Sequence, residues 1–322
     1  GGGGGGGGGG IDEFVNYDKI KWSESLKRDL QRGHYAEFDG AKIRTTLYRP
    51  FCKQNLFFDR ALIERVYLFP SFFPTPEAER ENRAIIVSDI GFRVATFGVL
   101  MADGIADLHL CATSDGHQCF PFYTYDEDGG NRRENVTDWV LGRFRERYGD
   151  GGITKWDVFY YVYGVLHHPG YRERFVENLR RELPRIPFMK DFRAFAEAGR
   201  RLAELHVGYE SVEPWELTWR TGDKLHYRVE KMRPSKDKTS LYVNETLTLA
   251  DIPPETFEYR LGNRSALDWV IDQYQVKTDK QTGAILSDPN RRDDPEYIVH
   301  LIARVVRVSV ETVQIVRALP AE

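Results

Sequence analysis

Residues 153–188, ITKWDVFYYVYGVLHHPGYRERFVENLRRELPRIPF, hold the clearest structural pattern in the chain. Thr154 is placed to cap a first helix, whose apolar and aromatic residues from Trp156 to Leu166 surround most of its circumference. A helix of this kind is expected to be buried on several sides. Pro169 then opens a second helix, because its missing N–H costs nothing in the first turn. The stretch predicts two packed helices at the centre of a domain.

The second helix carries one apolar stripe on an otherwise charged surface. Its apolar residues recur at every fourth position and are Tyr171, Phe175, Leu179 and Leu183. The PRIP segment at 184–187 ends the helix, because the residue before a proline is pushed out of the α region. His167 and His168 lie at the junction, where capping of the first helix explains them better than catalysis does.

Around this centre, strands precede the helices and return after them. Apolar or alternating runs predict strands at 43–48, 84–88, 93–100, 106–112, 120–125, 224–230, 241–244 and 257–261. Helices are expected at 17–32, 137–148, 190–206, 266–274 behind a Ser265 cap, and 297–319. This order predicts an α+β fold, with mixed or antiparallel sheet regions flanking a central helical subdomain.

The same order suggests how the chain is divided. Residues 1–10 are glycines, which we interpret as an artefact or a placeholder and exclude from fold reasoning. Residues 11–130 form a strand-rich subdomain, 131–215 a helical subdomain, and 216–322 a second strand-rich part with C-terminal helices. The acidic, glycine-containing segment 126–131 marks the first boundary. No Met precedes Ile11, so we expect a fragment of a longer polypeptide.

Composition is that of an ordinary globular protein, with 41% hydrophobic and 29% charged residues. No apolar run approaches the roughly 18 residues of a membrane span, and no signal peptide is visible. Three cysteines are too few for a disulfide framework, so a cytoplasmic location is expected.

Charge is distributed unevenly along the chain. The net charge of −4 gives no overall nucleic-acid signature. Residues 41–65 nevertheless carry six basic side chains against two acidic ones, and residues 217–238 carry seven against three. Two basic stretches in an acidic chain suggest a one-sided basic surface, although solvated strand and loop faces explain either stretch alone.

The familiar catalytic motifs are missing. The sequence contains no GxxxxGK[ST] phosphate loop, no [DE]-x-K triplet of a metal nuclease and no GxSxG elbow. The Asn/Asp-Pro-Pro-Tyr/Phe loop with which amino-methyltransferases hold a flipped base is also absent. These observations favour a binding module whose chemistry lies elsewhere, and hence a chain that is not itself an enzyme.

One set of side chains has the composition of a metal site. His109, Cys111, His117 and Cys119 flank a predicted turn, and on a hairpin their i, i+2 spacing turns them to one face, where they would bind Zn²⁺. Structural zinc sites more often use CxxC knuckles. Buried cysteines and hydrogen-bonded histidines are the commoner explanation, and no metal is expected.

Several blocks together resemble one family, the C-terminal target-recognition region of Type ISP restriction-modification enzymes. The blocks are LYRPFCKQNLFFD (47–59), HQCFPFYTYDEDG (117–129), VYGVLHHPGYRERFVENLRRELPRIPF (162–188), LHVGYESVEPW (205–215) and NRSALDWVIDQYQVKTDKQTGAILSDPNR (263–291), with SVETVQIV near the end. They span nearly the whole chain in the family's order.

The resemblance implies a role within a larger bacterial defence protein. Such enzymes carry a nuclease, a helicase-like ATPase, an adenine-N6 methyltransferase and then this region, which here would follow the methyltransferase catalytic loop. It implies recognition of a short double-stranded DNA site for the methyltransferase and the ATP-driven translocase. The partners would be DNA and the methyltransferase and ATPase domains of the same polypeptide, with no membrane. S-adenosylmethionine, ATP and Mg would be used by the parent protein and no cofactor by this region.

DNA recognition needs phosphate contacts that orient the domain and a few side chains at base edges. The residues that we predict for positioning are Arg44, Arg49 and Lys53. Those predicted for readout are Gln54, Asn55, Arg93, Ser114, His117 and Gln118, and a third group is Arg260, Asn263 and Arg264. Arg49, beside Pro50 and an aromatic cluster, is explained at least as well by an ion pair or by stacking.

Two other functions are compatible with the residues. The chain is an interdomain scaffold if it contacts the methyltransferase and motor rather than DNA. It is an enzyme if the predicted hairpin with His109 and Cys119 holds a cryptic site.

Overall fold

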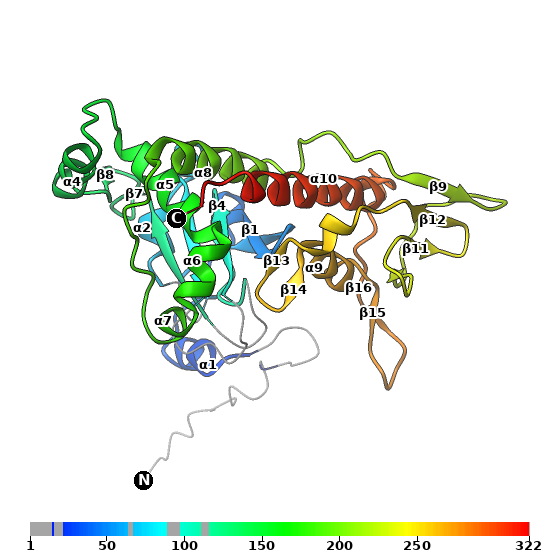
Figure 1. The fold of residues 1–322 in the computed structure, drawn as a ribbon. Helices are drawn as coiled ribbons and strands as arrows, with labels where there is room; N and C mark the ends of the chain where they lie inside the picture. Colours follow the sequence, from blue (N-terminus) through cyan, green and yellow to red (C-terminus); the bar gives the residue numbers. More distant parts are fainter. Residues whose placement is uncertain (1–14, 16–21, 64–66, 89–96, 111–115, 322) are drawn as a thin grey trace, which may run out of the picture.

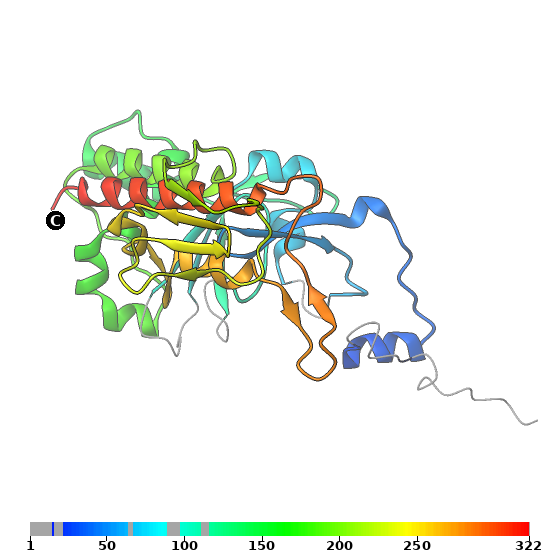
Figure 2. The same cartoon turned by 90° about the vertical axis from the view of Figure 1, so that its right-hand side faces the viewer.

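The computed structural model describes the chain except residues 1–14, 16–21, 64–66, 89–96, 111–115 and 322. Small sheets lie on one side of the molecule, and two long helices, α8 (Phe192–Val207) and α10 (Tyr297–Arg317), run along the other (Figures 1 and 2). The helices α4 to α8 form one block of sequence between two strand-rich blocks that contain only a few helices, which confirms the predicted α+β class.

The centre of the molecule is helical, as the sequence predicts. α5 (Lys155–His167) begins with a capping box, in which Thr154 accepts the N–H of Asp157 at 3.1 Å and Asp157 accepts that of Thr154 at 2.9 Å. Aromatic residues on several faces of α5 are buried. α4 (Asp138–Tyr148) precedes α5 in the chain, and α6 (Pro169–Arg174) and α7 (Val176–Arg181) follow it.

Two glycines allow α5 and α8 to touch backbone to backbone. A Cβ atom on Gly164 would lie 2.3 Å from the carbonyl oxygen of Phe195, and one on Gly199 would lie 1.7 Å from that of Tyr160. Any side chain at either position would therefore push the helices apart. The partner of α5 is thus α8 rather than the helix that follows it in sequence.

The first strand-rich part forms two three-stranded sheets. Sheet order is β2-β1-β5 in one and β4-β3-β6 in the other, and β1 pairs with β2 antiparallel but with β5 parallel. The strands are β1 (Ile43–Arg49), β2 (Cys52–Phe57), β3 (Ala84–Ser88), β4 (Val99–Ala102), β5 (Ile105–Ala106) and β6 (His117–Pro121), with the small pair β7 (Tyr123–Thr124) and β8 (Arg133–Glu134). Short helices in this part are α1 (Glu24–Gln31), η2 (Gly40–Lys42), α2 (Phe69–Phe72) and α3 (Pro76–Glu81).

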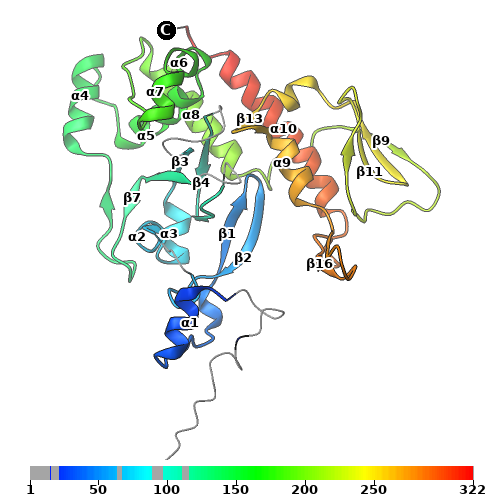
Figure 3. The ribbon, with the colours of Figure 1, turned by 90° about the horizontal axis from the view of Figure 1, so that it is seen from below.

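The second strand-rich part lies near the N-terminal end of α10, away from the C-terminus of the chain (Figure 3). Its four-stranded sheet has the order β10-β11-β12-β9, and two hairpins, β13-β14 and β15-β16, stand beside it. Its elements are β9 (Thr218–Thr221), β10 (Arg233–Pro234), β11 (Leu241–Asn244), β12 (Leu247–Ala250), η3 (Pro254–Phe257), β13 (Arg260–Leu261), β14 (Arg264–Ser265), α9 (Ala266–Gln273), β15 (Lys277–Thr278) and β16 (Ile285–Ser287).

Two hydrophobic clusters hold these parts together. One joins β1 and β2 to β11, β12, α9 and α10, so it draws on the first and the last stretch of the chain. The other joins β3 and β4 to α5 and α8. Because each cluster combines distant stretches, the strand-rich and helical parts pack as one body.

The second predicted helix is broken at Phe175, where α6 ends and α7 begins. A four-residue repeat drifts around a helix of 3.6 residues per turn, so a straight helix would not keep the whole stripe on one face. The break leaves Tyr171 and Leu179 buried, while Leu183 is 37% exposed. His168 caps both helices: it is the C-cap of α5, where its backbone N–H binds the carbonyl of Val165 at 3.0 Å, and its ring accepts the N–H of Tyr171 at 3.2 Å at the start of α6.

Residues 224–230 do not form the predicted strand. Asparagine side chains satisfy their backbone instead: the Asn290 amide bonds both N–H and C=O of Val229 at 2.7 and 2.8 Å, and Asn244 donates to the carbonyls of His226 and Arg228. In the predicted strand 106–112 only Ala106 is paired among the described residues, because Asp107 begins a turn by accepting the N–H of His109 at 2.9 Å; residues 111 and 112 lie outside the described residues.

Smaller differences lie at the ends of other elements. In the predicted helix 17–32 the structure describes α1, none of whose residues is buried, and residues 16–21 lie outside the described residues. In the predicted strand 257–261 only Arg260 and Leu261 pair. In 93–100 the strand is β4, which starts at Val99, with 93–96 outside the described residues.

A buried polar chain crosses the molecule. Tyr163 on α5 accepts the N–H of Met101 at 2.9 Å, and its hydroxyl is hydrogen-bonded to Nδ1 of His206 at 2.6 Å. The other ring nitrogen of His206 is 2.9 Å from the hydroxyl of Thr312 on α10. A neutral His206 therefore links a strand and three helices.

We expect the Gly199→Ala substitution to destabilise the domain by about 3 kcal/mol or more, because the new methyl group would collide with backbone rather than with a movable side chain. Gly142→Ala on α4 is the matched control, since open space surrounds that glycine. It should gain about 0.5–1 kcal/mol from helix propensity. Thermal unfolding of both variants tests this; an unchanged Tm for Gly199→Ala would contradict the close contact.

Stability should fall as the pH is lowered from 7 to 5. Burial lowers the pKa of His206 to about 3 and lowers that of His167 well below its usual value. Between pH 3 and 6.5 the unfolded chain therefore binds protons that the folded chain does not, which costs about 2 kcal/mol for His206 by pH 5. Urea unfolding should show that the free energy of unfolding falls between pH 7 and pH 5. In the His206→Gln variant this fall should be smaller by about 2 kcal/mol. Identical pH profiles for the two proteins would refute the assignment.

Candidate nucleic-acid interface

A cleft of about 750 Å³ opens between the β1-β2 ribbon and the start of β6. Its lining comes from two parts of the chain, residues 46–72 and 105–119, and consists of Thr46, Tyr48, Gln54, Asn55, Leu56, Phe58, Ile63, Tyr67, Leu68, Phe69, Phe72, Ile105, Ala106, Asp107, Leu108, His109, Gly116, His117, Gln118 and Cys119. Aromatic and aliphatic residues form its walls, and polar groups lie along β2 and β6.

Four predicted readout residues meet at this cleft. Gln54 and Asn55 lie on β2 opposite Thr46 and Thr45, and both are exposed. His117 and Gln118 lie at the start of β6 and are half-buried. The structure thus brings together two pairs that are more than sixty positions apart in the chain. The other two predicted readout residues, Arg93 and Ser114, lie outside the described residues.

Asp107 organises the polar end of the cleft. Its carboxylate binds Arg49 at 2.7 Å and the N–H of His109 at 2.9 Å, and its carbonyl oxygen lies 2.8 Å from Nε2 of His117. The edge of the His117 ring also meets Phe69, with ring centroids 6.2 Å apart. These contacts fix the imidazole while the amide side chains of β2 remain at the surface.

The residues predicted for phosphate positioning are bound inside the domain. Arg44 is buried, where it pairs with Glu79 and donates to the carbonyls of Phe73 and Pro74 at 2.9 and 3.1 Å. Burial in turn raises the pKa of the Glu79 carboxyl group. A guanidinium held in this way is engaged inside the domain, and its removal would leave the Glu79 carboxylate without its partner.

Arg49 and Lys53 are also engaged. Besides its pair with Asp107, Arg49 lies over the ring of Tyr48, 4.1 Å from the centroid, so it has both the ion pair and the stacking contact that its sequence neighbours suggest. The ammonium group of Lys53 is 2.9 Å from Glu210 and 5.3 Å from the ring centroid of Tyr209.

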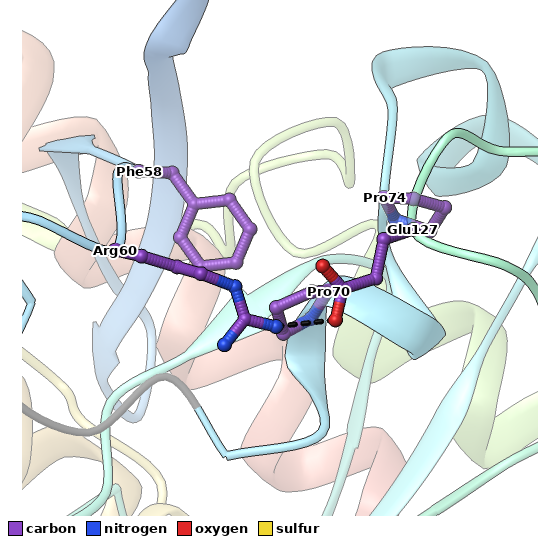
Figure 4. Close-up of a pocket in the computed structure, with 5 residues that line it drawn as sticks. All are labelled: Phe58, Arg60, Pro70, Pro74 and Glu127. Carbon is purple, nitrogen blue, oxygen red and sulfur yellow. Dashed lines mark hydrogen bonds and ion pairs between the residues drawn. The ribbon is translucent and has the colours of Figure 1, made fainter.

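The remaining described cations of residues 41–65 have acidic partners too. Lys42 pairs with Asp59, and Arg60 pairs with Glu127 across a small pocket beside Phe58 (Figure 4). Most partners in this stretch come from outside it, which is why the local charge balance overstated its positive potential. The predicted basic surface therefore has no excess charge at the β1-β2 ribbon within the described residues.

The second basic stretch is different. Arg228 pairs with Glu230 and Asp288 at 2.8 and 3.0 Å, and Lys238 lies 5.0 Å from the ring centroid of Phe257. Five further cations are exposed, and across the part of the chain that the structure describes none of them has an ion pair: Arg220, Lys224, Lys231, Arg233 and Lys236. These five cations are therefore the part of the second basic stretch that stays exposed to solvent without an ion pair among the described residues.

The third predicted group occupies the β13-β14 hairpin. Arg260 donates to the carbonyl of Asn263, which is exposed in the turn. Arg264 binds Asp272 at 3.0 Å and lies over the ring of Trp269, which is fully buried and donates its N–H to the carbonyl of Leu261 at 2.9 Å. The turn is rigidly supported but lies apart from the cleft lining.

The predicted zinc ligands are only partly described, because Cys111 lies outside the described residues. Among the described residues no cluster of three or more metal-ligating side chains occurs. His109 is in a turn rather than on a strand, and burial raises the pKa of the Cys119 thiol, which disfavours the thiolate that binds Zn²⁺.

Sequence reasoning missed part of this interface. Tyr67 and Leu68 form an exposed apolar wall of the cleft, and the exposed cations of β9, β10 and their loops were counted in a stretch but not chosen as candidates. The alternation of the predicted strand could have placed Thr46 in the cleft, because Thr46 pairs with Gln54. No local sequence pattern indicates that Tyr67 lines the cleft.

The fold and the cleft define an α+β binding domain without repeats. In the described part of the chain, no helix is long and apolar enough to cross a membrane. A family model described as the Type ISP C-terminal specificity domain matches residues 13–301. The chain belongs to this family. No match was found among curated protein sequences.

Solved structures of Type ISP and related enzymes have the same fold. A nuclease-deletion mutant of LlaGI in complex with a DNA substrate mimic is 35% identical, with a TM-score of 0.81, over 97% of this chain and 28% of that chain. A DrdV–DNA complex is 35% identical, with a TM-score of 0.84, over 97% and 32%. LlaBIII bound to DNA is 31% identical, with a TM-score of 0.81, over 94% and 20%. The chain thus spans between a fifth and a third of their length.

Proposed function

We propose that this domain recognises a specific site in double-stranded DNA on behalf of a Type ISP restriction-modification enzyme. The observation that carries the proposal is the meeting of Gln54, Asn55, His117 and Gln118 at one cleft, in a chain whose solved relatives include enzymes in complex with DNA. The interdomain scaffold is not favoured as the sole function, because it gives these exposed amides no role.

The chemistry of the cleft suits base readout. A two-stranded β-ribbon fits the major groove of B-DNA, and an Asn or Gln amide binds the N6 and N7 edge of adenine bidentately. Gln54 and Asn55 present such amides on the β1-β2 ribbon, and Gln118 faces the same cleft. The ring of His117 is held by the carbonyl oxygen of Asp107, so it supports the wall of the cleft beside these amides.

Phosphate contacts come from the second strand-rich part in this proposal. Arg220, Lys224, Lys231, Arg233 and Lys236 are exposed and lack ion pairs among the described residues, so they are available to release counterions from DNA. Arg44, Arg49 and Lys53 hold the ribbon in place instead. An isolated domain should accordingly bind duplex DNA weakly and with strong salt dependence.

The chemistry belongs to other domains of the polypeptide. This domain performs no catalysis and takes no cofactor, whereas the adenine methyltransferase uses S-adenosylmethionine and the translocase uses ATP and Mg. Recognition here directs both to the right place. The protein acts in the cytoplasm, in keeping with its sparse cysteines.

Loss of a single readout amide should relax specificity. After the preferred duplex has been selected from a random pool, Gln54→Ala, Asn55→Ala and Gln118→Ala should each weaken its binding by about 1–3 kcal/mol, that is, roughly five- to 150-fold, with little effect on unrelated duplexes. The control is Gln281→Ala, which removes an exposed amide from the β15-β16 turn. Equal losses on all sequences, or in the control, would remove the support for base readout.

The salt dependence separates the two basic stretches. The triple variant Arg220→Ala, Lys224→Ala, Lys236→Ala should flatten the slope of log K against log salt concentration by roughly 0.9 for each phosphate that the variant no longer neutralises. The control is Lys42→Ala with Arg60→Ala, two cations that already have acidic partners. If the control flattened the slope more than the triple variant did, DNA would lie along the first stretch.

A further inference from the structure

Six large apolar side chains between residues 35 and 68 are exposed. We call this set the N-terminal apolar patch; its members and their exposed fractions are Tyr35 75%, Phe38 81%, Ile43 47%, Leu62 48%, Tyr67 51% and Leu68 63%. The ring of Phe38 stacks on that of Phe57 at 6.0 Å, and Ile43 pairs with Phe57 across the ribbon. Tyr67 and Leu68 continue the patch into the wall of the cleft. Single exposed apolar residues are common, but a group of this size marks an interaction site.

Helix α1 extends the same surface. It is amphipathic, with Leu26 and Leu30 on one face, yet none of its residues is buried. It stands apart from the body of the domain, beside the end of β1 and β2 (Figure 3). An isolated helix of eight residues is marginal in water, so this one needs a partner against its apolar face.

The chemistry of the surface fits protein rather than DNA. Residues 22–43 carry four acidic and four basic side chains, apart from His34. Lys27 pairs with Glu24 and Lys42 pairs with Asp59, so little positive charge remains for phosphates. Aromatic and aliphatic groups without excess charge are typical of the centre of a protein interface.

We propose that α1 and the N-terminal apolar patch dock onto the domain that precedes this one in the same polypeptide. Family members place the specificity domain at the C-terminal end, and this chain spans only 20–32% of the solved chains that it resembles. In a polypeptide with that order, a preceding domain would be connected on the N-terminal side of α1. A tethered partner is present at high effective concentration, so a modest apolar surface is enough to hold it.

Docking at this surface has a geometric consequence for recognition. Tyr67 and Leu68 belong both to the patch and to the cleft wall, so the preceding domain lies at the mouth of the cleft. A duplex read by Gln54 and Asn55 then passes directly beside that domain. This consequence rests on the proposed DNA recognition; the docking itself does not.

The docking is tested by amide hydrogen exchange, measured without DNA. The experiment compares the 322-residue chain with a longer Type ISP polypeptide that contains it. Backbone amides in 24–43 and 67–72 should exchange at least about tenfold more slowly in the longer polypeptide. Those in 277–288 should be unchanged, although Ile285 and Leu286 are 61% and 68% exposed. Equal exchange of 24–43 in both proteins would overturn the proposal.

Substitutions then assign the protection to the patch. Phe38→Ser with Leu68→Ser should abolish the slower exchange in the longer polypeptide, and Ile285→Ser with Leu286→Ser should leave it intact. Protection that appears only when duplex DNA is added would show that DNA covers the patch. Protection of the short chain at high concentration would show that a second copy covers it. Either result would overturn the proposal. Failure of base discrimination by Gln54→Ala with protection intact would refute recognition alone.

Discussion

The contact between α5 and α8 at Gly164 and Gly199 determines the layout of the domain. Backbone contact at these glycines brings Tyr163 of α5 against His206 of α8, and through them Met101 of β4 and Thr312 of α10. A larger side chain at the crossing would separate the helices and leave buried polar atoms without partners, which costs more than the reduced packing alone. The close crossing and the polar chain therefore depend on each other.

This rigid centre supports a ribbon whose charges are already balanced. Arg44, Arg49 and Lys53 look like DNA contacts in the sequence, but each holds the β1-β2 ribbon to another element through Glu79, Asp107 or Glu210. Asp107 is the most connected of these acids, because it also fixes His109 and His117. The exposed amides of β2 are thereby presented on a stiff support, as precise hydrogen bonding to base edges requires.

Local sequence was enough for much of the fold. Capping by Thr154 and Ser265, the apolar run of β3 and the long C-terminal helix all depend on neighbouring residues, and these elements were predicted within a few positions. Contacts between distant residues account for the errors. Asn244 and Asn290 replace a strand ladder at 224–230. The meeting of Gln54 with Gln118 was likewise visible only in three dimensions; the sequence marked both as candidates without placing them in one cleft.

The separation of charge from readout has a physical advantage for a specificity domain. Phosphate attraction is the same for every sequence, so cations beside the reading side chains would raise affinity for wrong and right sites alike. On the proposed function, ion pairs neutralise the ribbon around Gln54, and phosphate contacts come from exposed cations on β9, β10 and their loops. Discrimination then comes from hydrogen bonds that a wrong base leaves unmade. The missing affinity can be supplied by the rest of the polypeptide, because a tethered second site strengthens binding without any new interaction in this domain. Weak binding by the isolated domain and sharp discrimination in the whole enzyme are therefore two consequences of one charge arrangement.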